Sequence, residues 1–223
     1  MGIRLFFYRD RKRDDDEMIL QERDMEILRV VYRMGFCLGR HIKSFVCFSS
    51  SRACDRRLVV LLGAGYLTRK KYLYGVPYLY TLAHRGRILI GANKRENKIR
   101  LEQIIHDTHV IDALIYFRDK YKLSLADITS ERELHIKDGF GARKHHPDFV
   151  FTHEGKTFAV EVELNPKTKL RLEKNIRDNY IKYDGQIWLT NDNKTFKLVS
   201  KVAEQYANIK VMWLKEVLSS DGN

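Results

Sequence analysis

The stretch from His145 to Lys167 reads His-His-Pro-Asp-Phe-Val-Phe-Thr-His-Glu-Gly-Lys-Thr-Phe-Ala-Val-Glu-Val-Glu-Leu-Asn-Pro-Lys. Two runs rich in apolar residues, 149–151 and 158–164, flank a Gly-containing turn, a pattern typical of a β-hairpin. Side chains alternate between the two faces of a strand, so Glu161 and Glu163 share one face and lie about 7 Å apart. The stretch therefore predicts a hairpin that carries two carboxylates side by side.

A third carboxylate stands near these two. Asp148 begins the first predicted strand and can reach the same end of the hairpin as Glu161 and Glu163. Carboxylates that converge repel one another unless a cation neutralises them. Mg²⁺ prefers hard oxygen ligands and can activate a water molecule, which favours it at such a site. A solvated face of an edge strand is the simpler interpretation, and the carboxylate pair alone leaves it open.

The positive charge of the chain is concentrated in its first half. The formal net charge is +12 over 223 residues. Residues 1–98 contain 21 Lys and Arg against 10 Asp and Glu, whereas residues 100–223 contain 20 against 19. A localised basic excess is the electrostatic footprint of a nucleic-acid-binding module. The three cysteines lack paired spacing and no long apolar run is present, so we expect a reduced, cytoplasmic protein without a membrane segment.

The basic half predicts a helical unit with a two-stranded hairpin. Apolar spacing and turn residues indicate helices at 21–34, 38–47 and 51–62, strands at 68–73 and 76–82, and a helix at 83–90. In the third helix Cys54, Leu58 and Leu61 fall on one side at 100° per residue. Arg52 and Arg56 lie nearly opposite, so this helix presents a basic face outward, with Ser51 as its expected N-cap.

This order of elements resembles winged-helix DNA-binding domains. In a helix–turn–helix the second helix enters the major groove, and here that helix is 51–62. A winged helix that serves only protein contacts is the alternative, which the charge distribution disfavours. The residues expected to contact DNA are Arg40, Lys43, Ser50, Ser51, Arg52, Arg56, Arg57, Arg69, Lys70, Lys71 and Tyr72.

The second half predicts an α/β sandwich. The expected elements are a helix at 101–121, a helix-to-strand segment at 128–136, the hairpin, a helix at 169–183 with Leu170, Leu172 and Ile176 inward, a strand at 186–190, a helix at 196–206 and a strand at 209–213. The fold expected for the whole chain is therefore mixed α/β, with a winged-helix domain at 21–92, a linker at 93–99, a sandwich at 100–217, an arm at 1–20 and a tail at 218–223.

The acidic motif resembles that of the PD-(D/E)XK nuclease family. The resemblance implies Asp148 and Glu161 as ligands of Mg²⁺ or Mn²⁺. It makes Glu163 a third ligand or a general base, at the place where the family most often has Lys. Lys167 is the candidate to supply the positive charge that the family's Lys provides. Glu133 is the candidate for an upstream acidic residue of the same catalytic site.

Residues 20–215 together resemble the replication-relaxation family of bacterial plasmids and mobile elements. The resemblance rests on the winged-helix order, the pair His106-x-x-His109, Pro147-Asp148, and Glu161–Leu164 followed by Lys167. It implies a DNA-binding protein of plasmid replication, copy control or DNA relaxation and mobilisation. The expected partners are double-stranded DNA, a replication initiator or relaxase, and a second copy of the chain.

Two other functions stay open at this point. One is a Mg²⁺-dependent endonuclease that the winged helix targets to its site. The other is a transcriptional regulator, which is a variant of the DNA-binding interpretation. The missing Lys favours binding without cleavage, whereas the three carboxylates favour the nuclease.

Overall fold

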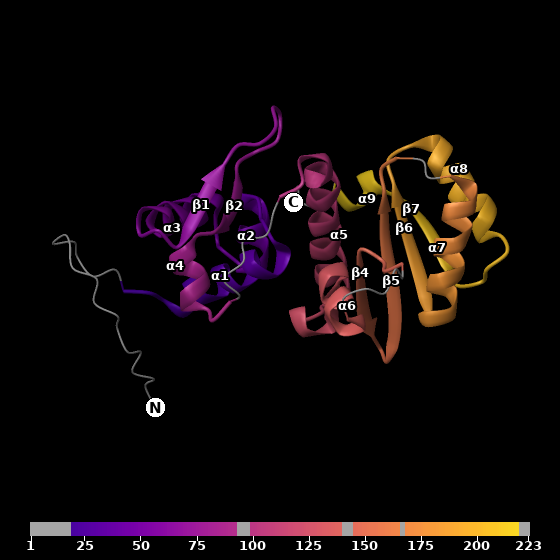
Figure 1. Ribbon diagram of the computed structural model, residues 1–223, viewed down its shortest axis with the longest axis horizontal. Helices are drawn as coiled ribbons and strands as arrows, with labels where there is room; N and C mark the ends of the chain where they lie inside the picture. The colour runs from indigo at the N-terminus through magenta and orange to yellow at the C-terminus, as the bar shows by residue number, and fades with distance from the viewer. Residues whose placement is uncertain (1–18, 93–98, 140–144, 166–167, 219–223) are drawn as a thin grey trace.

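The computed structural model describes residues 19–92, 99–139, 145–165 and 168–218, which form a mixed α/β protein with two sheets (Figure 1). Most of the predicted arm and tail, the linker residues 93–98, and Lys167 lie outside these ranges. Residues 19–92 make up the first unit of the fold, and residues 99–218 make up the second unit. None of the helices in these ranges is long and apolar enough to cross a membrane.

The first unit has the predicted order of elements. They are α1 (Glu22–Met34), α2 (Gly39–Phe45), α3 (Ser51–Gly63), β1 (Leu67–Lys70), β2 (Leu79–Leu82) and α4 (His84–Leu89). The two strands are shorter than expected, because pairing runs only from Leu67–Leu82 to Lys70–Leu79 and leaves 71–78 as a loop. The N-cap of α3 is Ser50 rather than Ser51, and its hydroxyl accepts a hydrogen bond from the N–H of Ala53 at 3.2 Å.

The second unit begins with a helical layer and continues as a five-stranded sheet. Its elements are η1 (Leu101–Gln103), α5 (Ile104–Tyr121), η2 (Leu125–Asp127), β3 (Ile128–Ser130), α6 (Glu131–Asp138), β4 (Phe149–His153), β5 (Lys156–Glu163), α7 (Lys169–Lys182), β6 (Gly185–Thr190), α8 (Asn193–Ala203), β7 (Ile209–Trp213) and α9 (Leu214–Leu218). In the segment before the hairpin the strand precedes the helix, which reverses the expected helix-to-strand order.

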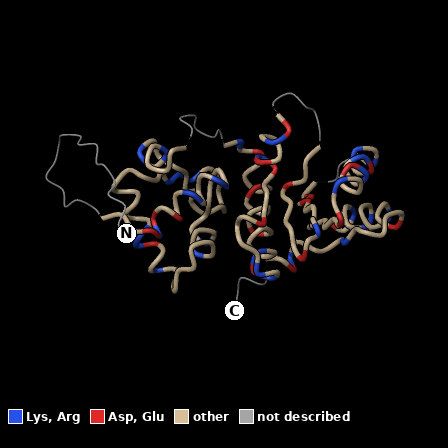
Figure 2. The backbone as a smooth tube through the Cα atoms, turned by 90° about the horizontal axis from the view of Figure 1, so that it is seen from below, with Lys and Arg blue, Asp and Glu red and all other residues tan. Residues whose placement is uncertain are grey.

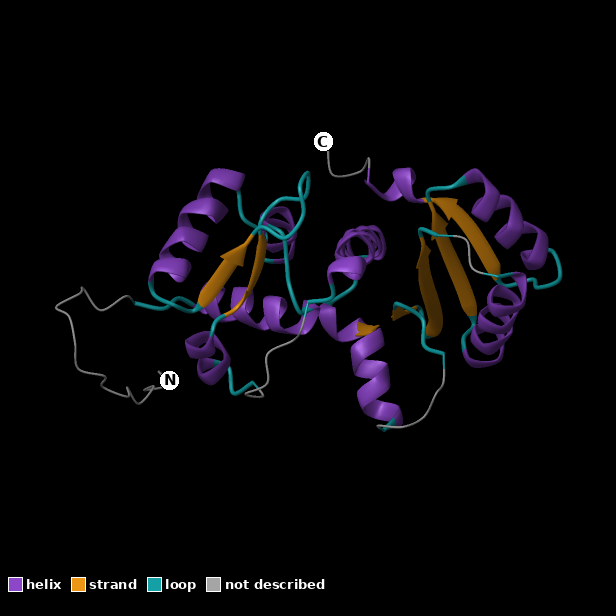
Figure 3. Cartoon of the chain, turned by 45° about the horizontal axis from the view of Figure 1, so that its top comes forward, coloured by secondary structure: helices purple, strands orange, loops and turns teal. Residues whose placement is uncertain are grey.

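The strand order of this sheet is β3-β4-β5-β6-β7. The first two pairings are antiparallel, and β5–β6 and β6–β7 are parallel. Figure 3 shows α5 on one side of the sheet and α7 with α8 on the other. Leu172 and Ile176 of α7 are buried against this second side, but Leu170 is 81% exposed, so its predicted inward position is wrong.

The hairpin that the sequence predicts is present as β4 and β5. Its loop consists of Glu154 and Gly155, whose φ angles of 50° and 73° match the left-handed geometry of a two-residue type I′ turn. β5 is the third strand of five, with a neighbour on both sides. Glu161 and Glu163 are therefore buried, at 4% and 5% exposure, and the interpretation as a solvated edge is wrong.

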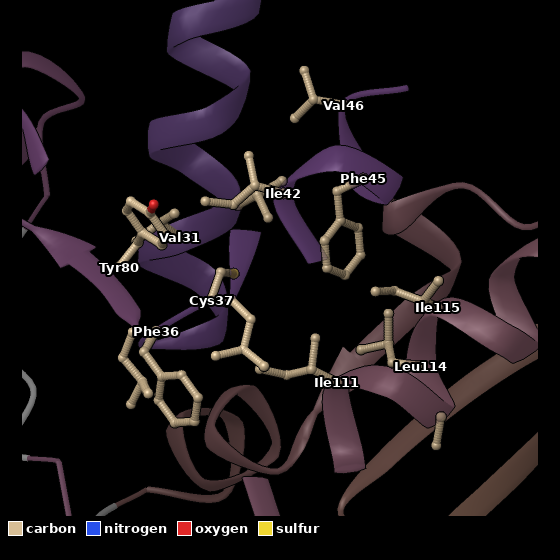
Figure 4. Close-up of a cluster of buried hydrophobic side chains, with 14 of the residues drawn as sticks. Val31, Phe36, Cys37, Ile42, Phe45, Val46, Tyr80, Ile111, Leu114 and Ile115 are labelled. Carbon is tan, nitrogen blue, oxygen red and sulfur yellow. The ribbon is translucent and has the colours of Figure 1, made fainter. Parts of the chain in front are cut away.

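The two units share one continuous apolar core. Phe45 and Val46, at the end of α2, belong to the same buried cluster as Ile111, Leu114 and Ile115 of α5 (Figure 4). Burial of this apolar surface favours docking of the first unit on α5, at about 25 cal/mol per Å² removed from water. The helix α3 is thus fixed with respect to the sheet of the second unit.

Candidate functional site

Helix α3 presents the basic face that its sequence predicts. Its buried residues are Cys54, Leu58 and Leu61, as expected from their spacing. Arg52 and Arg56 are exposed on the other side. The acidic Asp55 and the apolar Val59 and Val60 are exposed on the same helix. In Figure 2 the trace of the first unit carries more blue Lys and Arg segments than red acidic ones.

Two arginines of the predicted DNA-contacting set are bound by buried carboxylates instead. The Nε atom of Arg57 donates to Oδ1 of Asp24 at 2.6 Å, and a second guanidinium nitrogen binds Oδ2. Arg40 binds Asp112 of α5 in the same two-point manner. Removing a cation from a buried carboxylate is costly, so both arginines are needed within the fold. We therefore leave them out of the proposed DNA-contacting set.

The other members of that set divide between structural and exposed positions. Ser50 caps α3 with its hydroxyl, and Lys43 is half-buried on α2. Ser51, at the first turn of α3, is exposed beside the two arginines. The exposed group that remains therefore consists of the cap Ser50, of Ser51, Arg52 and Arg56 on α3, and of the cations of the β1–β2 hairpin.

The β1–β2 hairpin carries three exposed cations in succession, each above a tyrosine ring. The guanidinium carbon of Arg69 lies 4.6 Å from the ring centroid of Tyr78. The Nζ atoms of Lys70 and Lys71 lie 5.0 and 5.7 Å from the centroids of Tyr72 and Tyr74. β1 is in contact with α3, so the hairpin cations and the basic side of α3 belong to the same unit.

Asp148 lies between β5 and helix α5. Its Oδ2 accepts the backbone N–H of Val162 at 2.7 Å, and its Oδ1 lies 3.5 Å from Nε2 of His106. The same nitrogen donates to the carbonyl of Val162 at 3.0 Å. Burial alone would lower the pKa of His106, but the carboxylates of Asp107 and Asp148 raise it to about 10. A protonated imidazole thus neutralises Asp148 at neutral pH.

Glu161 is directed to the other side of the sheet. Its Oε1 accepts a hydrogen bond from Nδ2 of Asn179, on α7, at 2.9 Å and lies 2.6 Å from Nε2 of His145. Glu163 is the next residue on the same face of β5 and is also buried. The partners of Asp148 and Glu161 therefore lie on opposite faces of the sheet.

Glu131, two residues before the predicted Glu133, is close enough to Asp148 and Glu161 to be influenced by their charges. Burial and the charges of Asp148 and Glu161 raise the pKa of Glu131, partly offset by His135. Glu133 instead accepts hydrogen bonds from the N–H and hydroxyl of Ser130, both at 2.8 Å, as part of a capping box. Glu133 also pairs with Arg33 of α1 at 3.1 Å. These partners make Glu133 a contact between the two units.

No three His, Cys, Asp or Glu side chains are arranged to hold a metal ion within the described ranges. The residues that the nuclease resemblance implies as ligands have other partners here: an imidazole and a backbone N–H for Asp148, and an imidazole and an amide for Glu161. As arranged, these residues do not fit a shared cation. Metal binding would require rearrangement of the two imidazoles, and it stays a prediction.

A pocket of about 320 Å³ opens at the boundary between the two units. The first unit contributes the end of α1 and the residues directly after it, and the second unit contributes α5, α6 and the start of β4. Polar and charged residues are part of its lining: Arg33, Arg100, His106, Asp107, Ser130, Glu131, Arg132 and Asp148. The side chains of Glu131 and Asp148 are therefore reachable from solvent.

Comparison with known proteins yields no relative: no family model, no curated protein and no solved structure matches the chain.

Proposed function

We propose that this protein binds double-stranded DNA through α3 and the β1–β2 hairpin, in the manner of a winged-helix domain. The observation that carries the proposal is the placement of Arg52 and Arg56 on the exposed side of α3, in the same unit as the three exposed cations of the hairpin. Within the described ranges, neither arginine is paired with a buried carboxylate as Arg40 and Arg57 are. Their positions on the exposed side make them available to a polyanion.

Helix α3 and the hairpin would have different roles in DNA recognition. A helix in the major groove can place an arginine in two-point contact with guanine, which discriminates against the wrong base by about 1–3 kcal/mol. The hairpin cations would contact phosphates, which position the protein on the duplex without reading sequence. The fixed contact between the first unit and α5 would then hold the second unit at a constant place on the DNA.

We further propose that the second unit is a nuclease-like scaffold and that the protein serves a plasmid or mobile element. The expected process is replication, copy control or DNA relaxation and mobilisation, with a replication initiator or relaxase as the protein partner. The support is the order of elements around the β4–β5 hairpin, with Asp148 bound to the backbone of Val162, the residue after Glu161.

The test is binding of the full-length protein to a short random duplex, measured by fluorescence anisotropy over a series of salt concentrations. Binding that weakens linearly in log K against log [salt] supports the proposal, because each phosphate contact releases counterions. Absence of binding at low salt, or binding that salt leaves unchanged, contradicts it.

A Mg²⁺-dependent endonuclease is the second candidate. The observation in its favour is that two carboxylates, Glu131 and Asp148, both line the boundary pocket. A bound Mg²⁺ would neutralise these carboxylates and activate a water molecule. The histidine partners of Asp148 and Glu161 favour binding without cleavage, because an imidazole already lies against each carboxylate where a metal ion would bind.

A further inference from the structure

The loop between β1 and β2 presents one fully exposed aromatic ring. Tyr74 is 100% exposed, whereas Tyr66 and Tyr80 of the same unit are buried. Leu73 and Val76, on either side of the loop tip, are partly buried and pack against the apolar core. The ring of Tyr74 therefore projects into solvent from a loop whose flanking residues pack against the core.

The backbone conformation at the loop tip is consistent with the exposed position of Tyr74. Gly75 has φ of 79°, a left-handed conformation that a residue with a side chain rarely adopts. The chain thus reverses direction directly after Tyr74. Figure 1 shows the loop extending past the ends of both strands. An exposed ring at a sharp turn contributes nothing to the core and is available to a ligand.

The cations of the hairpin identify the chemistry of that ligand. Lys70 and Lys71 precede Tyr72 and Tyr74 in the chain, and each ammonium lies above one of these rings. Phosphate contacts need only the cations. A row of cations combined with an exposed ring is instead the arrangement that binds single-stranded nucleic acid, where the cations follow the backbone and aromatic rings stack on bases.

We propose that Tyr74 stacks on an unpaired base, so that the hairpin prefers DNA with a single-stranded or melted segment beside the duplex. In an intact duplex both faces of each base are covered by its neighbours, which leaves no face for the ring inside the helix. This inference rests on the proposed DNA-binding function and extends it, since it names the class of DNA structure that the protein selects.

The experiment compares two probes: a fully paired duplex, and the same duplex with a short central mismatched segment in which one base is 2-aminopurine. Wild-type protein should bind the mismatched probe more tightly and quench its fluorescence. Tyr74→Ala should weaken binding to the mismatched probe roughly tenfold, the size of one base–aromatic stack, and should not quench. Its affinity for the paired duplex should be unchanged.

Two variants serve as controls. Tyr74→Phe retains the ring and should behave as wild type on both probes. Lys71→Ala removes a charge and should weaken binding to both probes equally. If Tyr74→Ala weakens both probes equally, or leaves both unchanged, stacking by Tyr74 is ruled out while DNA binding stands. If the wild-type protein binds neither probe, the proposed function fails, and this inference fails with it.

Discussion

Arg40 of α2 and Asp112 of α5 form a two-point ion pair across the boundary between the units. Nη2 of Arg40 lies 2.8 Å from Oδ2 of Asp112, and its Nε lies 3.2 Å from Oδ1. His41 adds a contact from Nε2 to Oδ1 at 2.9 Å. The other ring nitrogen of His41 accepts the N–H of Leu38, so Nε2 carries the hydrogen. Asp112 thus ties the start of α2 to the second unit.

Replacement of Asp112 by Ala should destabilise the protein by about 3 kcal/mol. The carboxylate is 4% exposed, and its loss removes the acceptor for Nε2 of the buried His41 and the anion that pairs with Arg40. The measurement is urea denaturation followed by circular dichroism. Asp119→Ala is the matched control on the same helix, since Asp119 is exposed and should change stability by less than about 0.5 kcal/mol. Equal effects of the two variants would contradict this role of Asp112.

The contribution of Asp112 should depend on pH. Burial alone would raise its pKa, but hydrogen bonds from His109, His41 and Arg40 lower it well below the usual range. A folded-state pKa below the unfolded one stabilises the protein above the unfolded value, near 3.8, and this stability is lost as the pH falls. Wild type should therefore lose more stability than Asp112→Asn between about pH 5 and pH 3. Urea titrations at each pH measure these losses. Equal losses of stability for wild type and Asp112→Asn would show that the pKa of Asp112 is the same in the folded and unfolded states.

The basic face of α3 could be predicted because it depends only on spacing within one helix. The positions of Cys54, Leu58 and Leu61 at helical intervals determine which side is buried. The partners of Arg40 and Arg57 could not be predicted in this way. They lie 72 and 33 residues away in the chain, and nothing in the local sequence of either arginine indicates them.

The sequence contains a local signal that distinguishes the role of Glu133 from that of Glu131. Ser130-Glu131-Arg132-Glu133 is a capping-box pattern, in which the Ser and the Glu three residues later bind each other's backbone. The pattern assigns Glu133 to the start of α6. The expected helix-to-strand order places no helix start at Ser130, so the capping pattern is not interpreted as a cap. In the structure the helix follows the strand, and the pattern marks its start.

The burial of Glu161 and Glu163 depends on where β5 lies in the sheet. Alternation predicts which side chains share a face, and the structure confirms this. It does not reveal that β6 and β7 extend the sheet beyond β5, nor that His106 and His145 lie against Asp148 and Glu161. These depend on elements distant in the sequence.

Replacement of Arg69, Lys70 and Lys71 by Ala should weaken DNA binding equally on all sequences. If each cation contacts one phosphate, the slope of log K against log [salt] should decrease in magnitude by roughly 2.7, at about 0.9 per contact. Fluorescence anisotropy over a salt series measures both quantities on two unrelated duplexes. A loss that differs between the two sequences would show that the hairpin reads bases in the duplex.

The endonuclease candidate makes a separate prediction. If Asp148 and Glu161 bind Mg²⁺ or Mn²⁺, the metal should raise the melting temperature by mass action, and Asp148→Asn should abolish the increase. A metal would have to displace His145 from Glu161, so His145→Ala should strengthen the effect. Thermal melting is measured in parallel with a nicking assay on a supercoiled plasmid. If neither metal changes the melting temperature or the plasmid, for wild type and for both variants, the second unit is a scaffold without this activity.

Binding of DNA by the exposed face of α3 can be tested with two charge-matched double variants. Arg52→Ala/Arg56→Ala removes two positive charges from α3, and Arg171→Ala/Arg177→Ala removes two from the exposed side of α7, in the other unit. All four arginines are exposed, so both proteins should fold. We predict that the α3 variant binds duplex DNA at least about tenfold more weakly than wild type in anisotropy titrations at fixed salt, and that the α7 variant binds almost as wild type does. Equal losses for the two variants, or an unchanged affinity of the α3 variant, would contradict the claim.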